Sequence, residues 1–297
     1  MSQVFHTQGS PEIAVVGAGG FIGSRTRWLA EQQNVPTAAF TRANPLVLDG
    51  ELNPGARGVK TVVWSASMIT PSVAESSPEA VLEEREQFSE AVRVLSQQEQ
   101  RPRFIVLSSG GTVYGGTSAP YSEDDTPHPV NRYGAARLGL EQVAFESALN
   151  AIVLRVANAY GPGQKAVRGQ GVIGHWFNAI LEGKPITVYG DGTTVRDYVY
   201  VDDIARAILL AHASTTLNAN HILNIGSGEP TTLTKLARLC LRTADSNCEI
   251  RYEEHRGFDA PTNWLDVNAA AAQLGWSPSI TLREGLKHTW DSMQAGR

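Results

Sequence analysis

Short apolar runs and longer amphipathic segments alternate along this chain. Apolar runs at 13–16, 37–41, 61–67, 104–107 and 151–156 are typical of strands buried inside a parallel sheet. Residues 79–98 place apolar side chains on one face of a helix, and further amphipathic helices are predicted at 233–241, 267–274 and 282–293. This alternation predicts an α/β fold, a doubly wound parallel sheet with a smaller, mostly helical C-terminal lobe.

The lobe is expected to be discontinuous in sequence. Glycine and proline become frequent after residue 157, and the segment from Tyr198 to Ile225 has the pattern of a return to the sheet. We therefore expect residues 1–157 plus about 197–226 to form a cofactor-binding domain and residues 158–196 plus 227–297 to form a substrate lobe. Asp202 precedes an apolar helical stretch and is expected to be its N-cap.

Composition narrows the class of protein. The 297 residues are 42% hydrophobic and 19% charged, as in ordinary globular proteins. A net charge of −5 gives no reason to expect nucleic acid or an anionic membrane as a partner, and no apolar run is long enough to span a bilayer. Cys240 and Cys248 are too few for a disulfide framework, so we expect a cytoplasmic protein. The seven histidines are scattered, and no metal site is expected.

A glycine cluster follows the first predicted strand. Gly17, Gly20 and Gly23 have a G-x-x-G-x-x-G spacing, whereas the common dinucleotide pattern G-x-G-x-x-G would need a glycine at Ile22. A strand, a glycine turn and a helix present a helix N-terminus to a pyrophosphate, so we expect this loop, with Phe21 and Ile22, to bind a dinucleotide. The alternative is a purely structural turn.

Arg42 stands at the end of the second predicted strand. Enzymes that use NAD normally place an acidic residue there to bind the ribose hydroxyls, whereas a guanidinium suits a 2′-phosphate. The cofactor is therefore expected to be NAD or NADP, and Arg42 favours NADP. The alternative is a solvated arginine after a strand.

Two further stretches contain candidate catalytic residues. The fourth predicted strand ends in the hydroxyl-rich loop 108–115, at the edge where open α/β sheets bind ligands. Tyr133 and Arg137 are four residues apart, on one face of a helix. A guanidinium beside a phenol favours the phenolate, so Tyr133 is a candidate acid and base for a carbinol oxygen. The alternative is a surface pair on an amphipathic helix.

Taken together, these motifs resemble the extended short-chain dehydrogenase/reductases, and specifically the nucleotide-sugar epimerase/dehydratase group, which includes UDP-glucose 4-epimerases. The resemblance covers nearly the whole chain and rests on the order and spacing of the glycine loop 17–23, the serine loop 108–115, Tyr133-Gly134, and the stretches 158–162, 190–192, 196–203 and 274–278. It implies that the glycines bind the cofactor pyrophosphate, that Glu51 contacts adenine, and that Ala66 and Ser67 border the nicotinamide.

The resemblance also implies roles on the substrate side. Tyr133 would donate and accept the proton, and the nucleoside diphosphate of a nucleotide sugar would be held by Asn158, Arg196, Arg256 and Asp259. Cationic forks and an aspartate acceptor suit a diphosphate and a ribose diol. Surface salt bridges are the alternative for Arg196 and Arg256. A homodimer through a helix pair that includes the helix of Tyr133 is expected from the same resemblance.

The chain departs from the family pattern in three places. Arg137 replaces the lysine of Tyr-x-x-x-Lys, and an arginine stays charged without releasing a proton. The usual serine or threonine position falls on Gly110, so Ser109 or Thr112 has to supply the hydroxyl. Gly111 and Thr112 occupy the positions where dehydratases carry an acidic pair, which disfavours dehydration.

The sequence is compatible with three functions. The first is an NAD(P)-dependent nucleotide-sugar 4-epimerase that works through a keto-sugar intermediate. The second is an NADPH-dependent nucleotide-sugar 4-ketoreductase, which Arg42 favours. The third is a catalytically weakened protein that only binds cofactor or sugar nucleotide, which Arg137 and Gly110 favour.

Overall fold

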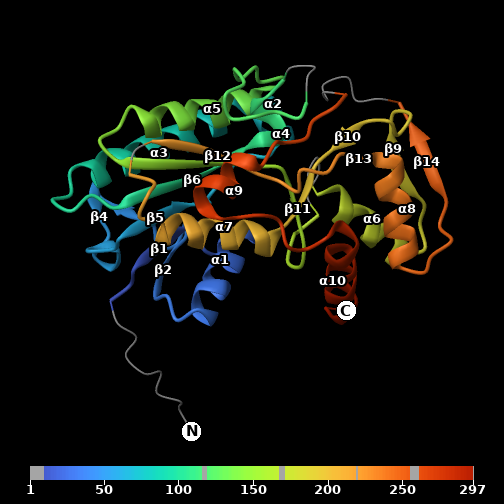
Figure 1. Cartoon of the computed structure of the whole chain (residues 1–297), viewed down its shortest axis with the longest axis horizontal. Coiled ribbons are helices and arrows are strands. Elements are labelled where there is room, and N and C mark those ends of the chain that lie inside the picture. The colour runs from blue at the N-terminus through green and yellow to red at the C-terminus, as the bar shows by residue number, and fades with distance from the viewer. Residues whose placement is uncertain (1–9, 116–118, 167–170, 219, 255–260, 297) are drawn as a thin grey trace, which may run out of the picture.

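A six-stranded parallel sheet forms the centre of the molecule (Figure 1). The computed structural model describes residues 10–115, 119–166, 171–218, 220–254 and 261–296. The strands follow the order β12-β7-β6-β5-β1-β2, and their bounds are β1 Ile13–Val16, β2 Thr37–Phe40, β5 Thr61–Trp64, β6 Arg103–Ser109, β7 Asn150–Val156 and β12 His221–Ile225. The order reverses beside β1, so a ligand crevice is expected outside the carboxyl ends of β1 and β5.

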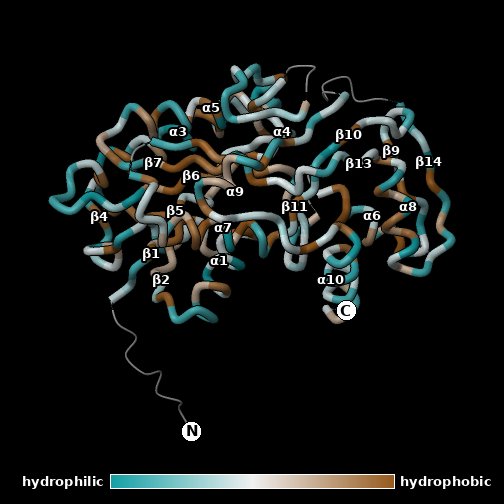
Figure 2. The backbone as a smooth tube through the Cα atoms, viewed as in Figure 1, coloured by the Kyte–Doolittle hydropathy of each residue, from teal (hydrophilic) through white to brown (hydrophobic). Residues whose placement is uncertain are grey.

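Helices cover both faces of this sheet. On one face lie α1 (Phe21–Gln32) and α7 (Val201–Ala213), and on the other lie α3 (Pro78–Ser96) and α5 (Arg132–Phe145) (Figure 1). The inner strands are apolar on both faces and appear brown in Figure 2, because each face buries its own hydrophobic core against a helix layer. Side chains fix the helix starts: Ser77 caps α3 and Asn131 caps α5.

The lobe beside the sheet has its own core. It is built from α6 (Val172–Leu181), α8 (Leu233–Thr243) and α10 (Leu282–Ala295), with the strand pairs β9 (Ile186–Tyr189)–β14 (Ile250–Glu253) and β10 (Val195–Arg196)–β13 (Thr231–Thr232). A parallel pair, β8 (Asn158–Tyr160) and β11 (Tyr198–Tyr200), joins lobe and sheet. The remaining short elements are β3 Val47–Leu48, β4 Glu51–Leu52, η1 Pro54–Ala56, α2 Pro71–Ser76, α4 Gly110–Val113 and α9 Asn268–Leu274.

The predicted α/β fold with a smaller lobe is confirmed, and the element ends differ by a few residues. Helix α7 begins at Val201 with Tyr200 as its N-cap, so the expected capping role of Asp202 is wrong. Asp202 instead lies in the first turn and pairs with Arg25 of α1, with 2.6 Å between Nη2 and Oδ2. The domain division remains a prediction. Within the stretch expected to belong to the lobe, Leu265 and Ala270 pack in the core of the sheet.

Candidate functional site

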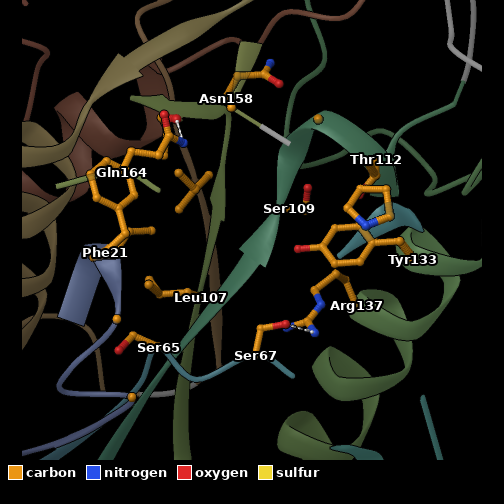
Figure 3. Close-up of a pocket in the computed structure, with 18 of the residues that line it drawn as sticks. Phe21, Ser65, Ser67, Leu107, Ser109, Thr112, Tyr133, Arg137, Asn158 and Gln164 are labelled. Atoms are coloured by element: carbon orange, nitrogen blue, oxygen red, sulfur yellow. Dashed lines mark hydrogen bonds between the residues drawn. The ribbon is translucent and has the colours of Figure 1, made fainter. Parts of the chain in front are cut away.

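One cavity of about 1950 Å³ runs from the glycine loop to the wall of the lobe. It lies at the carboxyl ends of β1, β5, β6 and β7, where the strand order reverses, and it extends to Asn158, Trp176 and Arg196. Ligand pockets for one small molecule usually measure about 300–1,000 Å³. The volume therefore suits two ligands end to end. Figure 3 shows the central part of this cavity.

The glycine loop is built for close approach of the backbone. Gly17 has φ +84°, and a β-carbon there would stand 2.6 Å from the backbone nitrogen of Ala66. Helix α1 starts after Gly20 with no side-chain cap and no acidic residue in its first turn, which leaves its N–H groups for an anion. Gly17, Gly20, Phe21 and Ile22 line the cavity.

Gly23 serves packing. A β-carbon there would lie 2.3 Å from the carbonyl oxygen of Gly17, so only glycine lets α1 pack this closely on the loop. Gly23 is buried and is not among the residues that line the cavity.

The expected adenosine end of the cavity contains Arg42. Its side chain is exposed at the end of β2 and borders the cavity with Thr41 and Pro45. Glu51 lies on β4, is exposed, and does not line the cavity. The structure therefore brings Arg42, and not Glu51, to the predicted cofactor site.

The hydroxyl loop continues β6 into the short helix α4. Ser109 and Thr112 line the cavity, and the Thr112 Oγ1 atom is buried and finds no hydrogen-bond partner in the described part of the chain. A β-carbon on Gly110 would stand 2.6 Å from Leu265 Cδ1, so Gly110 is closed off by packing. Gly111 has open space, and a β-carbon there would lie 3.9 Å from the amide group of Asn158 and from Ser109 Oγ.

Tyr133 lies in the first turn of α5, and its hydroxyl points into the middle of the cavity (Figure 3). Gly134 brings it there: a β-carbon on Gly134 would be 2.2 Å from the carbonyl oxygen of Thr112, so α4 and α5 touch through backbone. Asn131 Oδ1 accepts a hydrogen bond from the Gly134 N–H at 2.8 Å and fixes the start of the helix. The structure thus brings together Tyr133, Thr112 and Ser109.

Arg137 lies one turn after Tyr133, with its guanidinium carbon 5.1 Å from the centre of the phenol ring. It borders the cavity, and it donates hydrogen bonds from Nη2 to Glu84 Oε1 at 2.6 Å and to Ser67 Oγ at 3.0 Å. Burial acts to lower the pKa of Arg137, but Tyr133 and Glu84 together raise the pKa above its ordinary value. Arg137 therefore stays a cation. Ala66 and Ser67 also line the cavity, as expected.

A second buried network holds α5 in place beneath the site. Glu141 of α5 accepts hydrogen bonds from Ser108 of β6 and from Arg155 of β7, the latter with 2.7 Å between Nη2 and Oε2. Tyr114 donates to Asn224 Oδ1 at 2.9 Å and accepts from Arg155 Nη1 at 2.8 Å. Burial raises the pKa of Tyr114 to about 12, which keeps this phenol neutral. Tyr114 is therefore structural.

The lobe side of the cavity contains Asn158, Gln164 and Arg196. Asn158 Nδ2 donates to the backbone oxygen of Asp197 at 2.9 Å, which orients its amide beside the cavity. The buried Asp197 carboxylate accepts from the Ser227 N–H at 2.7 Å and from Leu265 N–H at 3.4 Å, so it fastens three loops around the site. Arg256 and Asp259, the other predicted substrate residues, lie outside the described residues.

Sequence reasoning missed Glu84, Asn131 and Gln164. A signal for Glu84 was present, because it interrupts the apolar face of α3 between Val81 and Phe88. A carboxylate on a buried face requires a partner. Gln164 is fixed by a hydrogen bond from its Nε2 to the Ala159 oxygen at 2.9 Å. Nothing in the spacing of Asn131 or Gln164 distinguishes them from loop residues.

Two kinds of feature are absent from the part of the chain that the structure describes. None of its His, Cys, Asp and Glu residues gather in groups of three or more suited to a metal ion. No helix among the same residues has the length and apolar character needed to cross a bilayer.

Comparisons with known proteins find relatives whose family matches the glycine loop, the serine loop and Tyr133 around the cavity. Residues 13–226 match the NAD dependent epimerase/dehydratase family. A dTDP-4-dehydro-6-deoxyglucose reductase of Escherichia coli is 35% identical over 188 residues, which are 62% of this chain and 59% of that protein. A putative UDP-glucose 4-epimerase of Methanocaldococcus jannaschii is 28% identical over 95% of this chain and 98% of its own length.

A solved structure extends the likeness over the lobe. MoeE5 in complex with UDP-glucuronic acid and NAD has a TM-score of 0.86 with 27% identity, covering 96% of this chain and all of that one (100%). The family match covers the glycine loop, the serine loop and Tyr133. This chain belongs to the NAD dependent epimerase/dehydratase family.

Proposed function

We propose that this protein is an NAD(P)-dependent nucleotide-sugar 4-epimerase. The observation that carries the proposal is the position of the Tyr133 hydroxyl, which points into the cavity beside Thr112 and Ser109 and next to a cationic Arg137. A phenol in that position can exchange a proton with a sugar hydroxyl. The cavity is large enough for a dinucleotide and a nucleotide sugar together.

In this proposal the cofactor lies along the glycine loop. The uncapped start of α1 holds its pyrophosphate, and Ala66 and Ser67 border its nicotinamide. A nicotinamide bound there supplies an acceptor and donor of hydride. The sugar nucleotide lies toward the lobe, where Asn158 and Arg196 bind its diphosphate, with Arg256 and Asp259 as further predicted contacts.

Tyr133 would accept the proton of the sugar 4-hydroxyl, and a nicotinamide held beside Ala66 and Ser67 would supply the hydride acceptor that turns the carbinol into a keto group. Thr112, whose hydroxyl has no partner within the described ranges, would donate a hydrogen bond to the same sugar oxygen, and Ser109 is the alternative donor. Arg137 would stabilise the negative charge of the phenolate before Tyr133 takes up the proton and again after Tyr133 gives it back. After the keto sugar turns its other face toward the hydride donor, Tyr133 would give the proton back to the sugar oxygen. No carboxylate follows Gly110 in the hydroxyl loop, which disfavours elimination.

The second candidate is a 4-ketoreductase, which runs half of this chemistry with exchangeable NADPH. The E. coli relative named as a reductase favours it, and so does Arg42 at the cofactor end of the cavity. Arg42 is therefore the only residue that supports a preference for NADP over NAD in this proposal. A protein that binds ligands without turnover is the third candidate. The homodimer and the cytoplasmic location also stay predictions.

The decisive experiment is to purify the protein gently and determine the mass of the small molecules that it retains. Retained NAD with conversion between 4-epimers of UDP- or dTDP-sugars supports the epimerase. Oxidation of NADPH only in the presence of a 4-keto sugar supports the reductase. Tyr133→Phe is expected to lower turnover by about 10²–10⁴-fold. Equal turnover by the two forms, including none at all, would contradict both enzymatic candidates.

A further inference from the structure

Glu84 is a buried carboxylate that has no role in the chemistry described above. It projects from α3, its side chain is 4% exposed, and it faces α5. Arg137 Nη2 donates to its Oε1 at 2.6 Å, and the Arg137 side chain is also 4% exposed. The three groups Tyr133, Arg137 and Glu84 therefore form a continuous series of phenol, guanidinium and carboxylate that starts in the cavity and ends under α3.

The geometry of this ion pair is unfavourable for stability alone. Glu84 Oε2 and Arg137 Nε are both buried and have no hydrogen-bond partner among the residues that the structure describes. An arginine and a carboxylate that pair for stability usually form two parallel hydrogen bonds, and an unsatisfied buried polar atom is costly. Buried ion pairs are also weak evidence for stability in general. Glu84 thus contacts Arg137 through Nη2 alone, while the guanidinium carbon lies 5.1 Å from the centre of the Tyr133 ring and Arg137 borders the cavity.

We propose that Glu84 is a positioning residue that acts on Tyr133 through Arg137. It holds the guanidinium beside the phenol and offsets part of its positive charge. This inference rests on the proposed function, because it assigns to Glu84 the tuning of the proton-exchanging phenol. An arginine cannot lose its charge as a lysine can, so a buried anion behind it limits how strongly the phenolate is favoured.

The first test compares how the same substitution, Glu→Gln, at two buried glutamates affects the titration of Tyr133. Glu84→Gln removes one anion, and Glu141→Gln is the matched control, because Glu141 also pairs with a buried arginine, Arg155, but neither partner lines the cavity. The phenol of Tyr133 is titrated by NMR in protein labelled with ¹³C-tyrosine, and its signal is identified by its loss in Tyr133→Phe. This readout requires no turnover.

In Glu84→Gln the midpoint of the Tyr133 titration is expected to move to lower pH by about half a unit to one unit, less than the shift from a directly adjacent charge. Glu141→Gln is expected to leave it in place. The acidic limb of the kcat/KM profile should move with the NMR midpoint. No shift in Glu84→Gln, or the same shift in both variants, would overturn the proposal.

Two further variants separate charge from packing. Glu84→Asp keeps the charge and is expected to keep the midpoint near that of the native protein. The double variant Glu84→Met with Arg137→Met replaces the pair by apolar side chains, which buried sites often tolerate. Its midpoint is expected to rise, because the cation is lost with the anion, and an unchanged midpoint would overturn the proposal even where Glu84→Gln fails to fold.

The NMR titration also keeps this inference distinct from the proposed function. If Glu84→Gln shifts the Tyr133 titration midpoint but the protein converts no nucleotide sugar, the epimerase and the reductase are both contradicted. The proposed action of Glu84 on Tyr133 is then still supported. If turnover depends on Tyr133 but Glu84→Gln does not shift the Tyr133 titration midpoint, the enzymatic function is supported and the proposed role of Glu84 is wrong.

Discussion

Gly110 packs against Leu265, which is fully buried, and a β-carbon on the glycine would stand 2.6 Å from Leu265 Cδ1 and 3.1 Å from the Arg155 carbonyl oxygen. The position where the family usually carries a serine or threonine is thus closed by a side chain from the other end of the chain. The loss of the hydroxyl and the presence of Leu265 are two parts of one packing arrangement.

Restoring a serine there is therefore expected to destabilise the protein. Gly110→Ser should lower the free energy of unfolding by about 1–3 kcal/mol, the usual effect of overpacking a filled core. Gly111→Ser is the control, since its β-carbon would have no neighbour closer than 3.9 Å. Urea unfolding of both variants measures the difference. Equal midpoints would mean that Leu265 moves aside freely.

The Thr112 hydroxyl gives a prediction in which activity and stability change in opposite directions. Its Oγ1 atom is buried without a partner in the described structure, so Thr112→Val should not lower stability and is expected to raise it by up to about 1 kcal/mol. Turnover should fall by about tenfold or more if this hydroxyl binds the reacting sugar oxygen. Ser109→Ala distinguishes the alternative. A loss of turnover in Ser109→Ala only would assign the role to Ser109.

Gly23 and Gly139 are both helical glycines, but they differ in their surroundings. A β-carbon on Gly23 would be 2.3 Å from the Gly17 oxygen, whereas a β-carbon on Gly139 would meet no described atom within 4 Å beyond the backbone of its own helix. Gly139→Ala should stabilise the protein by about 0.5–1 kcal/mol through helix propensity. Gly23→Ala should destabilise it and weaken retention of the cofactor. Thermal unfolding and cofactor titration check both results, and a stabilised Gly23→Ala would show that α1 can move away from the loop.

Arg42 is the residue on which the choice of cofactor depends. Arg42→Ala should weaken NADP binding by about tenfold or more, because hydrogen bonds to a charged group contribute about 1.5–3 kcal/mol. NAD binding should change little. Arg57→Ala, at an exposed arginine outside the cavity lining, is the control. Calorimetric titration at two salt concentrations measures both affinities. Equal losses for NAD and NADP would remove the 2′-phosphate from the interpretation.

Much of the fold could be predicted because its signals are local. The run 13–16, the glycine loop and the Tyr133-to-Arg137 spacing each specify structure within a few residues, and the strands and helices form where the pattern predicts them. What could not be predicted depends on contacts between distant segments. The pairing of Arg137 with Glu84, the packing of Leu265 on Gly110 and the ion pair of Arg25 with Asp202 all join residues more than 50 positions apart. Local spacing contains no information on these contacts.

The residues of the candidate site could likewise be predicted only where a short motif contains them. Gly17, Gly20, Tyr133 and Asn158 were found because each belongs to a short motif, and all four line the cavity. The role of Glu51 rests on resemblance alone, and its exposed side chain on β4 does not line the cavity. A motif specifies its own residues well, whereas the partner of a motif residue has to come from the tertiary structure.

His212 gives the expected dependence of stability on pH. It lies at the end of α7, with 2.8 Å between its Nδ1 and Thr61 Oγ1. Burial lowers the pKa of His212 below its ordinary value of 6.5, and Arg103 and Lys60 lower it further, while Glu12 opposes them. The unfolded chain therefore binds a proton at a higher pH than the folded protein does.

The direction in which stability changes with pH follows from proton linkage at His212. Stability should be fully present above about pH 6.5, the ordinary histidine value, and should fall as the pH drops below it. One such group gives a slope of at most about 1.4 kcal/mol per pH unit. Urea unfolding between about pH 5 and pH 8 measures this slope for the native protein, for His212→Gln, and for His288→Gln as a control at an exposed histidine of α10. The slope should flatten in His212→Gln alone, because only there does folding expel a proton from a buried ring. A slope unchanged in His212→Gln would assign the acid sensitivity to other groups.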